Sequence, residues 1–476
     1  MRASSKMHLL ALMFMCLVGV ASARSHTENA HTHSTHTNSA HTGGGTSVDN
    51  GMDTQLPLKT FRGMTGEAKG CIECHAKKNP GIVADWKMSR HAHAGVSCID
   101  CHGITKDSPM LTMDGHEGSK VPISVLVSTN TCAKCHEKEV TEFRHSGHSR
   151  GAVQTWAKAS MRTLMIEVEG RGHPDLGRAP SITGCSQCHG TIIKLNKNRR
   201  PTPETWPTYG IGTAFPDGSL GNCASCHSAH KFSLVEARKP AACASCHLGP
   251  DHPDIEIYNN SMHGHIYNTE GEQWNFDAAP GTWKVPDFRA PTCATCHMSG
   301  NSKSAVTHNV SRRLKWNLFM PLSQLRTGGY ETASDAFKYD NKITAGNPLA
   351  GNVKGPEAAR EEMKAGCMDC HNSTHVDNFF LMADKNIMLY NEYYQEAVKM
   401  RDALAKKHLL GKDMWSDDFQ NTMYHMWHHE GRRMRQGGIM MAPDYSHWHG
   451  VFEVQQDIRK LRKIYAKRIK TNQIED

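Results

Sequence analysis

The sequence predicts a mostly α-helical protein with a cysteine-dense N-terminal part and long C-terminal helices. Every cysteine except Cys16 belongs to one of eight C-x-x-C-H motifs, which begin at Cys71 and end at His371. Alternating apolar and polar residues, which would predict strands, are scarce. Beyond Cys370 the apolar residues recur at the three- and four-residue spacing of amphipathic helices.

Residues 1–23 have the features of a secretory signal. Arg2 and Lys6 supply positive charge, residues 8–20 are mostly apolar but too short to span a bilayer, and "ASA" at 21–23 suits cleavage. We therefore expect an exported, periplasmic protein with no integral membrane segment in the mature chain. An uncleaved anchor is the alternative.

Residues 24–53 are rich in Ser, Thr, His, Asn and Gly, a composition that cannot bury a core. We expect a flexible tail there, with loose metal binding as the alternative. A haem-binding domain is expected over 54–385 and a helical region over 386–476. The net charge of +8 would permit an anionic partner. Cofactor carboxylates can offset this charge, so no nucleic-acid partner is expected.

The C-x-x-C-H motif is the attachment signature of c-type haem. Its two thiols bond to the vinyl groups of one porphyrin, and the adjacent histidine reaches the iron from the same side. Zinc ribbons and redox-active cysteine pairs do not explain eight histidines in identical positions. The sequence therefore predicts eight haem c groups and a multihaem cytochrome c fold.

The predicted attachment cysteines are Cys71, Cys74, Cys98, Cys101, Cys132, Cys135, Cys185, Cys188, Cys223, Cys226, Cys243, Cys246, Cys293, Cys296, Cys367 and Cys370. The predicted proximal iron ligands are His75, His102, His136, His189, His227, His247, His297 and His371.

A second iron ligand is predicted from other histidines, because imidazole is a usual axial ligand. The pattern aromatic-x-x-Ser-x-His ends at His91, His148 and His263. A helical turn would bring the aromatic ring and the serine near the histidine, one to pack and one to orient it. Four weaker candidates complete the predicted set: His116, His230, His308 and His375.

Two of these weaker candidates, His230 and His375, follow their own motifs too closely to reach the opposite face of the same iron. We expect them to serve neighbouring haems. His173 is an alternative to His116 or His308, and a surface role is the alternative for all of them.

Three long helices are expected after the last motif. Residues 386–410 end before Gly411, residues 416–436 end at Gly437 and Gly438, and residues 443–470 begin with a proline. Such helices suggest a bundle that is used to oligomerise.

The sequences "GCSQCHG", "CHLGPDHP" and "DYSHWHG", together with the eight motifs, resemble the octahaem hydroxylamine oxidoreductase family over 71–470. The resemblance implies an intertwined homotrimer that oxidises hydroxylamine in the periplasm. It also implies that a small cytochrome c accepts the electrons. No C-terminal membrane helix of the kind some relatives carry is expected.

The resemblance also implies site residues. The catalytic haem would be attached at Cys185 and Cys188, with an open iron position opposite His189. Asp251 and His252 would form an acid–base pair above it. Tyr445 would be cross-linked to this porphyrin in a neighbouring subunit, and Tyr330 or Tyr339 would supply a further aromatic ring.

Other functions stay open at this point. The same family oxidises hydrazine to dinitrogen, and relatives that lack the cross-linking tyrosine reduce nitrite or hydroxylamine. A non-catalytic electron-transfer cytochrome would instead require every iron to carry two axial ligands. Hydroxylamine and hydrazine cannot be separated by sequence, because small residues in the wall of the site decide access.

Overall fold

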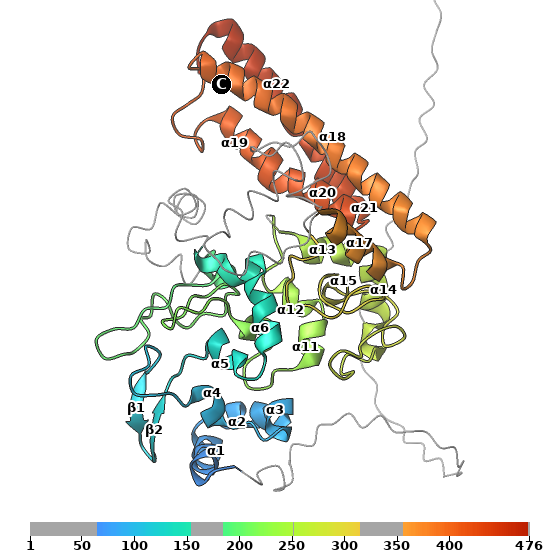
Figure 1. The fold of residues 1–476 in the computed structure, drawn as a ribbon. Coiled ribbons are helices and arrows are strands. Elements are labelled where there is room, and N and C mark those ends of the chain that lie inside the picture. Colours follow the sequence, from blue (N-terminus) through green and yellow to red (C-terminus); the bar gives the residue numbers. More distant parts are fainter. Residues whose placement is uncertain (1–63, 154–183, 251, 315–355, 475–476) are drawn as a thin grey trace, which may run out of the picture. The chain divides into compact units, whose positions relative to one another are not determined.

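The computed structural model describes residues 64–153, 184–250, 252–314 and 356–474 (Figure 1). The chain divides into two units, Met1–Gly51 and Met52–Asp476, and all described residues belong to the second. The predicted signal and tail lie outside the described residues. So do four residues considered for the sites: His173, Asp251, Tyr330 and Tyr339.

The N-terminal part consists of short helices joined by loops, as the sequence predicts. They are α1 (Gly66–Lys78), α2 (Pro80–Met88), α3 (Arg90–His93), α4 (Cys98–His102), α5 (Thr129–Ala133), α6 (Glu137–Arg144), η2 (Gly147–Arg150), α10 (Ser186–His189), η4 (Cys223–Ser225), α11 (Leu234–Arg238), α12 (Ala241–Ala244), α13 (Asp254–Asn260), α14 (Met262–Glu270), η5 (Gly271–Gln273) and α15 (Cys293–His297).

The described residues contain a single sheet, an antiparallel hairpin of β1 (Met113–His116) and β2 (Ser119–Ile123). Met113 pairs with Ile123, and the register changes between Asp114 and His116. Gly115 lies at this irregularity with a φ of 82°, a conformation that glycine adopts without strain. The hairpin thus ends by turning His116 out of the regular pleat.

Several C-x-x-C-H motifs form one helical turn, which places both cysteines and the histidine on one side. In α4, Ser97 and Asp100 form a capping box, in which Asp100 accepts a hydrogen bond from the Ser97 backbone at 2.7 Å. In α15, Thr292 and Thr295 form the equivalent pair. These caps satisfy backbone donors at the helix start and so fix the motif conformation locally.

The C-terminal part contains the long helices. They are α17 (Pro356–Cys367), α18 (Ser373–Lys406), α19 (Asp418–His425), the π-helix η7 (Met426–Glu430), α20 (Gly431–Ile439), α21 (Pro443–Ser446), the π-helix η8 (His447–Phe452) and α22 (Glu453–Thr471). Helix α18 begins earlier than predicted, because the Asn372 side chain caps it by accepting a hydrogen bond from the His375 backbone at 2.9 Å.

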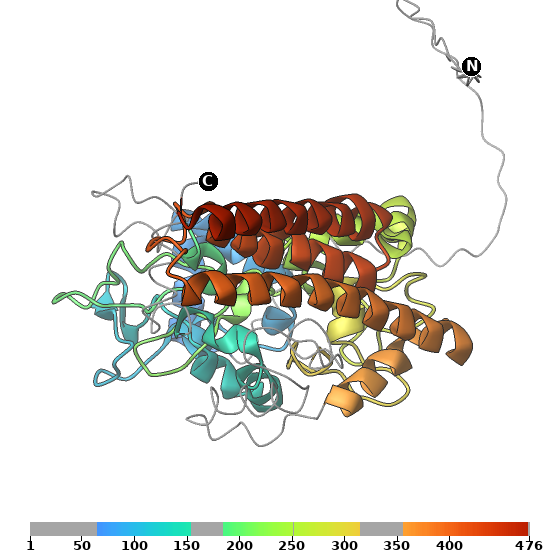
Figure 2. The ribbon, with the colours of Figure 1, turned by 90° about the horizontal axis from the view of Figure 1, so that it is seen from above.

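Helices α18 and α22 run side by side in the same direction (Figures 1 and 2). Their contacts show this: Gln455 of α22 bonds to Tyr393, and Arg462, about two turns onward, bonds to Glu396. Helices α19 and α20 run back between them. The buried core of this bundle includes Leu404, Phe419 and Leu461.

The predicted end of the second helix at Gly437 and Gly438 is wrong, because both glycines lie inside α20. A Cβ atom on Gly437 would lie 2.6 Å from the backbone nitrogen of Ser446, and one on Gly438 would lie 2.2 Å from the Asn386 amide. The glycines therefore allow α20 to pack closely against α21 and α18 rather than ending the helix.

A buried ion pair joins the ends of three helices at one end of the bundle. Arg468 of α22 donates to the Asp417 carboxylate at 2.9 Å and to the Leu409 carbonyl at 3.0 Å. Asp417 is also the N-cap of α19, through a bond from Gln420. Burial raises the pKa of Asp417, but hydrogen bonds from Gln420, Gly411 and Arg468 outweigh it and leave the pKa below its usual value.

The described helices include none with the length and apolar character needed to cross a membrane.

Replacing Arg468 by Met should strongly destabilise this bundle, because Asp417 would keep a buried charge with no cation beside it. We expect a loss of about 3–5 kcal/mol in local opening free energy, measured by hydrogen exchange over 418–425 and 453–471. The matched control is Arg462→Met, whose pair with Glu396 is 50% and 39% exposed. That change should cost about 1 kcal/mol or less. Equal costs would contradict the assigned role.

Candidate haem-binding cavity and catalytic site

A large internal cavity, about 3070 Å³ in volume, runs through the N-terminal part. Cysteines from the second through the eighth motif line it, from Cys101 to Cys367. The motif cysteines are not joined in disulfides in the described structure. Apolar clusters around the cavity are small, such as that of Ile72, Val83, Trp86 and Ala92. Groups other than side chains must therefore fill the interior, which is what covalently attached haems would do.

The order of the motifs in space differs from their order in the sequence. The Cys132 and Cys223 thiols are near neighbours, which places the third motif beside the fifth. Cys188 neighbours Cys246, so the fourth motif lies beside the sixth. Cys243 in turn neighbours Cys293 of the seventh.

Charge interactions extend these contacts to the remaining motifs. Burial, and after it the neighbouring thiol of Cys71, raises the pKa of Cys98. Burial, and then the neighbouring Cys132, raises the pKa of Cys101. Burial and the neighbouring Cys367 likewise raise the pKa of Cys296. The attachment points therefore form one continuous series from the first motif to the eighth, with the fourth joined through the sixth.

Six proximal histidines each face a second histidine ring across a similar gap. The pairs and their ring-centre distances are His75–His116 at 6.3 Å, His136–His91 at 6.0 Å, His102–His230 at 6.3 Å, His247–His148 at 6.0 Å, His227–His308 at 6.5 Å and His371–His263 at 6.2 Å. Metal–imidazole bonds are about 2 Å long. Two such bonds, with the distance from each nitrogen to its ring centre, fit these gaps.

The structure places His375 differently from the other six predicted distal histidines. The His375 ring stacks on the ring of His371, the histidine of the motif just before it. The two ring centres are 4.4 Å apart, and the ring planes are 13° from parallel. This gap is too short for an iron between the two rings. The reason is local, because the Asn372 cap starts α18 directly after the motif and lays His375 over His371. His263 lies across the 6.2 Å gap instead.

In two of the three copies of the aromatic-x-x-Ser-x-His pattern, the serine caps a helix rather than contacting the imidazole, whereas Ser146 in the third copy makes no such cap bond. Ser89 donates to the Trp86 carbonyl at 2.6 Å and accepts from the Ala92 backbone at 3.1 Å. Ser261 repeats both bonds, to Tyr258 at 2.7 Å and from Gly264 at 3.1 Å. The histidine thus occupies the second position of a capped turn, and its direction is set through the backbone.

Burial favours the neutral form of these imidazoles, which is the form that binds metals. Burial and the nearby His247, His297 and His189 lower the pKa of His148 to about 4. Burial and His308 lower the pKa of His227 to about 4. These rings can therefore bind iron at neutral pH without first losing a proton.

Several proximal histidines are held by a hydrogen bond at Nδ1, which leaves Nε2 for the iron. His75 bonds to the Asn79 side chain and His102 to the Ser124 carbonyl, both at 2.8 Å. His247 bonds to the Asp254 carboxylate at 2.7 Å.

Asp254 was not identified from the sequence. Burial raises its pKa, but the bond to His247 and the charges of His247, His252 and His297 outweigh this, and the pKa is lowered. An ionised carboxylate at the first position of α13 raises the pKa of His247, which makes that imidazole more electron-donating. In the sequence, the only feature that pointed to Asp254 was its position three residues after Asp251.

His252 lies in the cavity that also contains Cys185, Cys188 and His189. Its ring is perpendicular to that of His247 at 6.3 Å. The predicted partner Asp251 lies outside the described residues. The fourth and sixth motifs lie beside each other at Cys188 and Cys246, and the ring contact of His252 is with His247 of the sixth motif.

Arg432 of α20 holds His252 and was also not predicted. Its guanidinium donates to His252 Nε2 at 3.0 Å, and it lies over the Trp427 ring at 5.7 Å. Both residues line the cavity. The C-terminal bundle therefore contributes a cation to the wall of this site within the same chain.

Tyr445 lies on α21, half-buried, with its ring stacked on His449 at 5.4 Å. The adjacent Asp444 backbone donates to Asn260 of α13 at 3.1 Å. Among the described residues, the wall of the cavity extends to Met441 but does not include Tyr445. The tyrosine thus lies near α13 without entering the cavity of its own chain.

Parts of the chain match three families of haem-binding proteins. Residues 211–329 match the family described as seven times multi-haem cytochrome CxxCH. Residues 171–248 match cytochrome c7 and related cytochrome c, and residues 21–103 match cytochrome c554 and c-prime.

Two characterised relatives are similar in sequence. A probable nitrite reductase–hydroxylamine oxidoreductase fusion protein of Kuenenia stuttgartiensis is 30% identical over 346 residues, 64% of this chain. The multiheme cytochrome MtrA of Shewanella baltica is 24% identical over 206 residues, 40% of this chain. The matches span 34% of the fusion protein and 55% of MtrA, so the chain corresponds to only part of each.

Two solved structures have the same fold. A hypothetical multiheme protein superposes with a TM-score of 0.71 at 24% identity, over 89% of this chain and 99% of the other. A reducing HAO-like protein complex of Kuenenia stuttgartiensis superposes with a TM-score of 0.61 at 20% sequence identity. The match covers 85% of this chain and 86% of the other. With the motifs and the cavity, these likenesses identify the chain as a multihaem cytochrome c with a mostly helical fold.

Proposed function

We propose that this cytochrome oxidises hydroxylamine at the haem attached to Cys185 and Cys188, and passes the electrons through seven further haems to a small cytochrome c. One observation carries the proposal. His252, held by Arg432, lies in the cavity where the Cys185 and Cys243 motifs meet. A positioned base beside one haem, connected to a series of others, suits a reaction that removes protons and electrons together.

The resemblance noted in the sequence and the similarity to the nitrite reductase–hydroxylamine oxidoreductase fusion protein support this assignment. The open iron position opposite His189, the homotrimer and the cross-link to Tyr445 come from the resemblance. Asp251, predicted as the second member of the acid–base pair, belongs to the proposal on the same ground. A signal at 1–23 and a periplasmic location complete it.

The chain's own residues have definite tasks in this proposal. When bound, the haem supplies an iron that takes electrons from the nitrogen of the substrate. His252 accepts the bond from Arg432 at Nε2, so the neutral ring carries its proton on Nδ1. Nε2 is the only basic nitrogen of this tautomer, so the imidazole can take a released substrate proton once the Arg432 bond opens, and the freed Arg432 then stabilises developing negative charge nearby.

Electron transfer is assigned to the six histidine pairs and to the Cys293 haem. The first step from the catalytic haem would go to the Cys243 haem, because the Cys188 and Cys246 thiols are in contact. From there the series branches towards Cys223 and Cys293.

Reduction of nitrite or hydroxylamine is the second candidate, favoured by the word "reducing" in the name of one structural neighbour. Hydrazine oxidation and electron transfer without catalysis are the remaining alternatives. Turnover with hydroxylamine, hydrazine and nitrite, using artificial electron acceptors and donors, separates all four. Activity with hydroxylamine in the oxidative direction is expected, and its absence would refute the proposal.

His263 and His375 give opposite expectations for the haem at Cys367. Replacing His263 by Ala should remove the ligand opposite His371 and convert one low-spin ferric haem to high-spin. His375→Ala is the matched control and should leave the low-spin count unchanged, because its ring does not face the iron. Low-temperature electron paramagnetic resonance with haem quantification measures both. A high-spin haem in His375→Ala but not in His263→Ala would instead make His375 the ligand opposite His371.

His252→Gln should lower hydroxylamine turnover at least about a hundredfold, the usual scale for loss of a general base. Asp251→Asn should have an effect of the same size. Haem content should not change in either variant. His265→Gln, at an exposed position of α14, serves as the control with normal turnover. Near-normal rates for both His252 and Asp251 variants would make the pair structural.

Tyr445→Phe should abolish a covalent trimer. The cross-link survives boiling in detergent, whereas packing contacts do not, so wild-type trimers should persist on a denaturing gel. Peptide mapping should find the 441–450 segment on the Cys185 haem. The variant should run as monomer and shift from oxidation towards reduction. A wild-type protein that runs wholly as monomer, with an unmodified haem, would remove the main support for the oxidative direction.

A further inference from the structure

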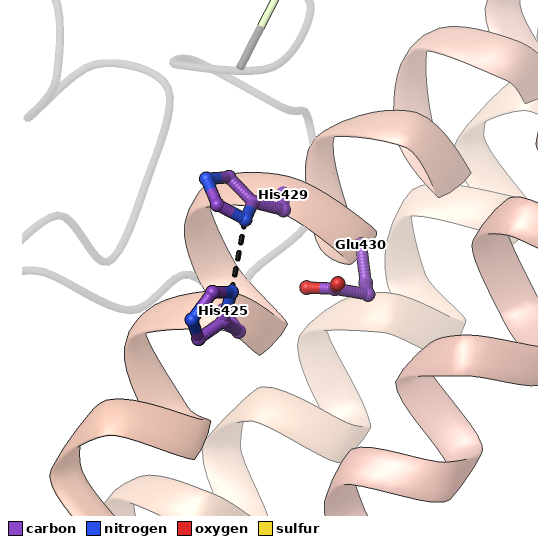
Figure 3. Close-up of side chains that lie close together, drawn as sticks. All are labelled: His425, His429 and Glu430. Atoms are coloured by element: carbon purple, nitrogen blue, oxygen red, sulfur yellow. Dashed lines mark hydrogen bonds between the residues drawn. The ribbon is translucent and has the colours of Figure 1, made fainter. Parts of the chain in front are cut away.

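A second cluster of metal-binding side chains lies in the C-terminal bundle, away from the cavity. His425 ends α19, and His429 and Glu430 lie in the π-helix η7 that follows. One potential ligand atom from each residue lies within 4.8 Å of the others. Figure 3 shows the two rings facing each other and the Glu430 carboxylate pointing towards them. None of the three residues lines the haem cavity.

The geometry of the two imidazoles is that of ligands sharing one ion. Their Nδ1 atoms are 2.9 Å apart. Two nitrogens about 2.1 Å from one metal, at a right angle, lie about 3 Å apart. A hydrogen bond between the two rings gives the same distance, so this spacing alone does not decide between them.

The neighbouring carboxylates decide it. The Oε2 atom of Glu430 and the Oδ2 atom of Asp457 are buried without a hydrogen-bond partner within the described structure. Asp457 lies on α22, close enough for the Glu430 charge to act on it.

Nearby cations do not compensate for these carboxylates. Arg433 donates to Glu453 at 2.8 Å. Lys460 lowers the pKa of Asp457, but its side chain is exposed to solvent. Two imidazoles and the Glu430 carboxylate therefore lie within reach of one ion, and the buried Glu430 oxygen has no hydrogen bond within the described structure to satisfy it.

We propose that His425, His429 and Glu430 bind a divalent transition-metal ion, with the buried Asp457 carboxylate of α22 as a neighbouring charge. Imidazole and carboxylate ligands suit zinc, ferrous iron and manganese. The ion joins the end of α19 to the π-helix η7, so its role is to fix the turn that leads into α20 and positions Arg432. This site is independent of the hydroxylamine proposal.

The test uses the complete haem-loaded protein after removal of adventitious metal by a chelator. Zinc binding is measured by equilibrium dialysis and elemental analysis, in which haem iron does not interfere. His429→Gln should bind one equivalent less zinc than wild type. Asp457→Asn should bind that equivalent at least about tenfold more weakly. His447→Gln, an exposed histidine on η8, is the matched control and should match wild type.

The histidines of residues 24–53 also bind zinc in principle, but they are common to all variants and cancel in the difference. Hydrogen exchange over 418–439 and 453–471 gives a second readout. Zinc should protect these segments in wild type and in His447→Gln, but not in His429→Gln. Equal zinc stoichiometry in wild type and His429→Gln, with no protection in either, would overturn the site and leave a simple hydrogen bond between the rings.

Discussion

The fold depends on an interior that side chains do not fill. A cavity of about 3070 Å³ would be untenable in an ordinary protein, whose interior is packed at crystal-like density. Here the apolar clusters are small, and the side chains along the cavity include cysteines and histidines from seven of the eight motifs. The N-terminal part must therefore receive its haems to gain a core, which couples cofactor attachment to folding.

The C-terminal bundle solves a different problem. It has a core of its own, including Phe419, Met434 and Ile458, and a buried ion pair at its far end. It needs no cofactor to bury its apolar faces. Because it is stable in this way, it can hold a charged side chain such as Arg432 against His252 at a precise distance. One part of the chain supplies redox groups, and the other supplies fixed polar groups at their edge.

What could be predicted from the sequence was what is encoded locally. A motif of five consecutive residues predicts haem attachment, and helical periodicity predicts the three long helices. Contacts between distant residues were not predictable. Arg432 and His252 are 180 residues apart, and no pattern in either segment indicates the other. The spatial order of the motifs has the same origin, since Cys188 meets Cys246 across an intervening motif.

Local patterns also misled where one residue type has two uses. Gly437 and Gly438 predicted the end of a helix, but in α20 they allow close packing. The serine before His91 was expected to orient an imidazole, but it caps the turn that carries it. His375 was expected to reach another haem, but a cap at Asn372 fixed it over His371. In each case the residue serves the backbone, through close helix packing or a helix cap, and not the role that its side chain was predicted to have.

The π-helix η7 shows how one helical segment can serve two sites. A π-turn inserts an extra residue and so rotates everything after it relative to an ideal α-helix. Before and within the turn, His425, His429 and Glu430 come together outside the cavity lining, whereas Trp427 of the same turn lines the cavity. After it, Arg432 and Arg435 line the cavity. His429 and the bond from Arg432 to His252 thus belong to one continuous helical segment. A structural ion at η7 would therefore act on the cavity wall beside His252 through the helix that they share.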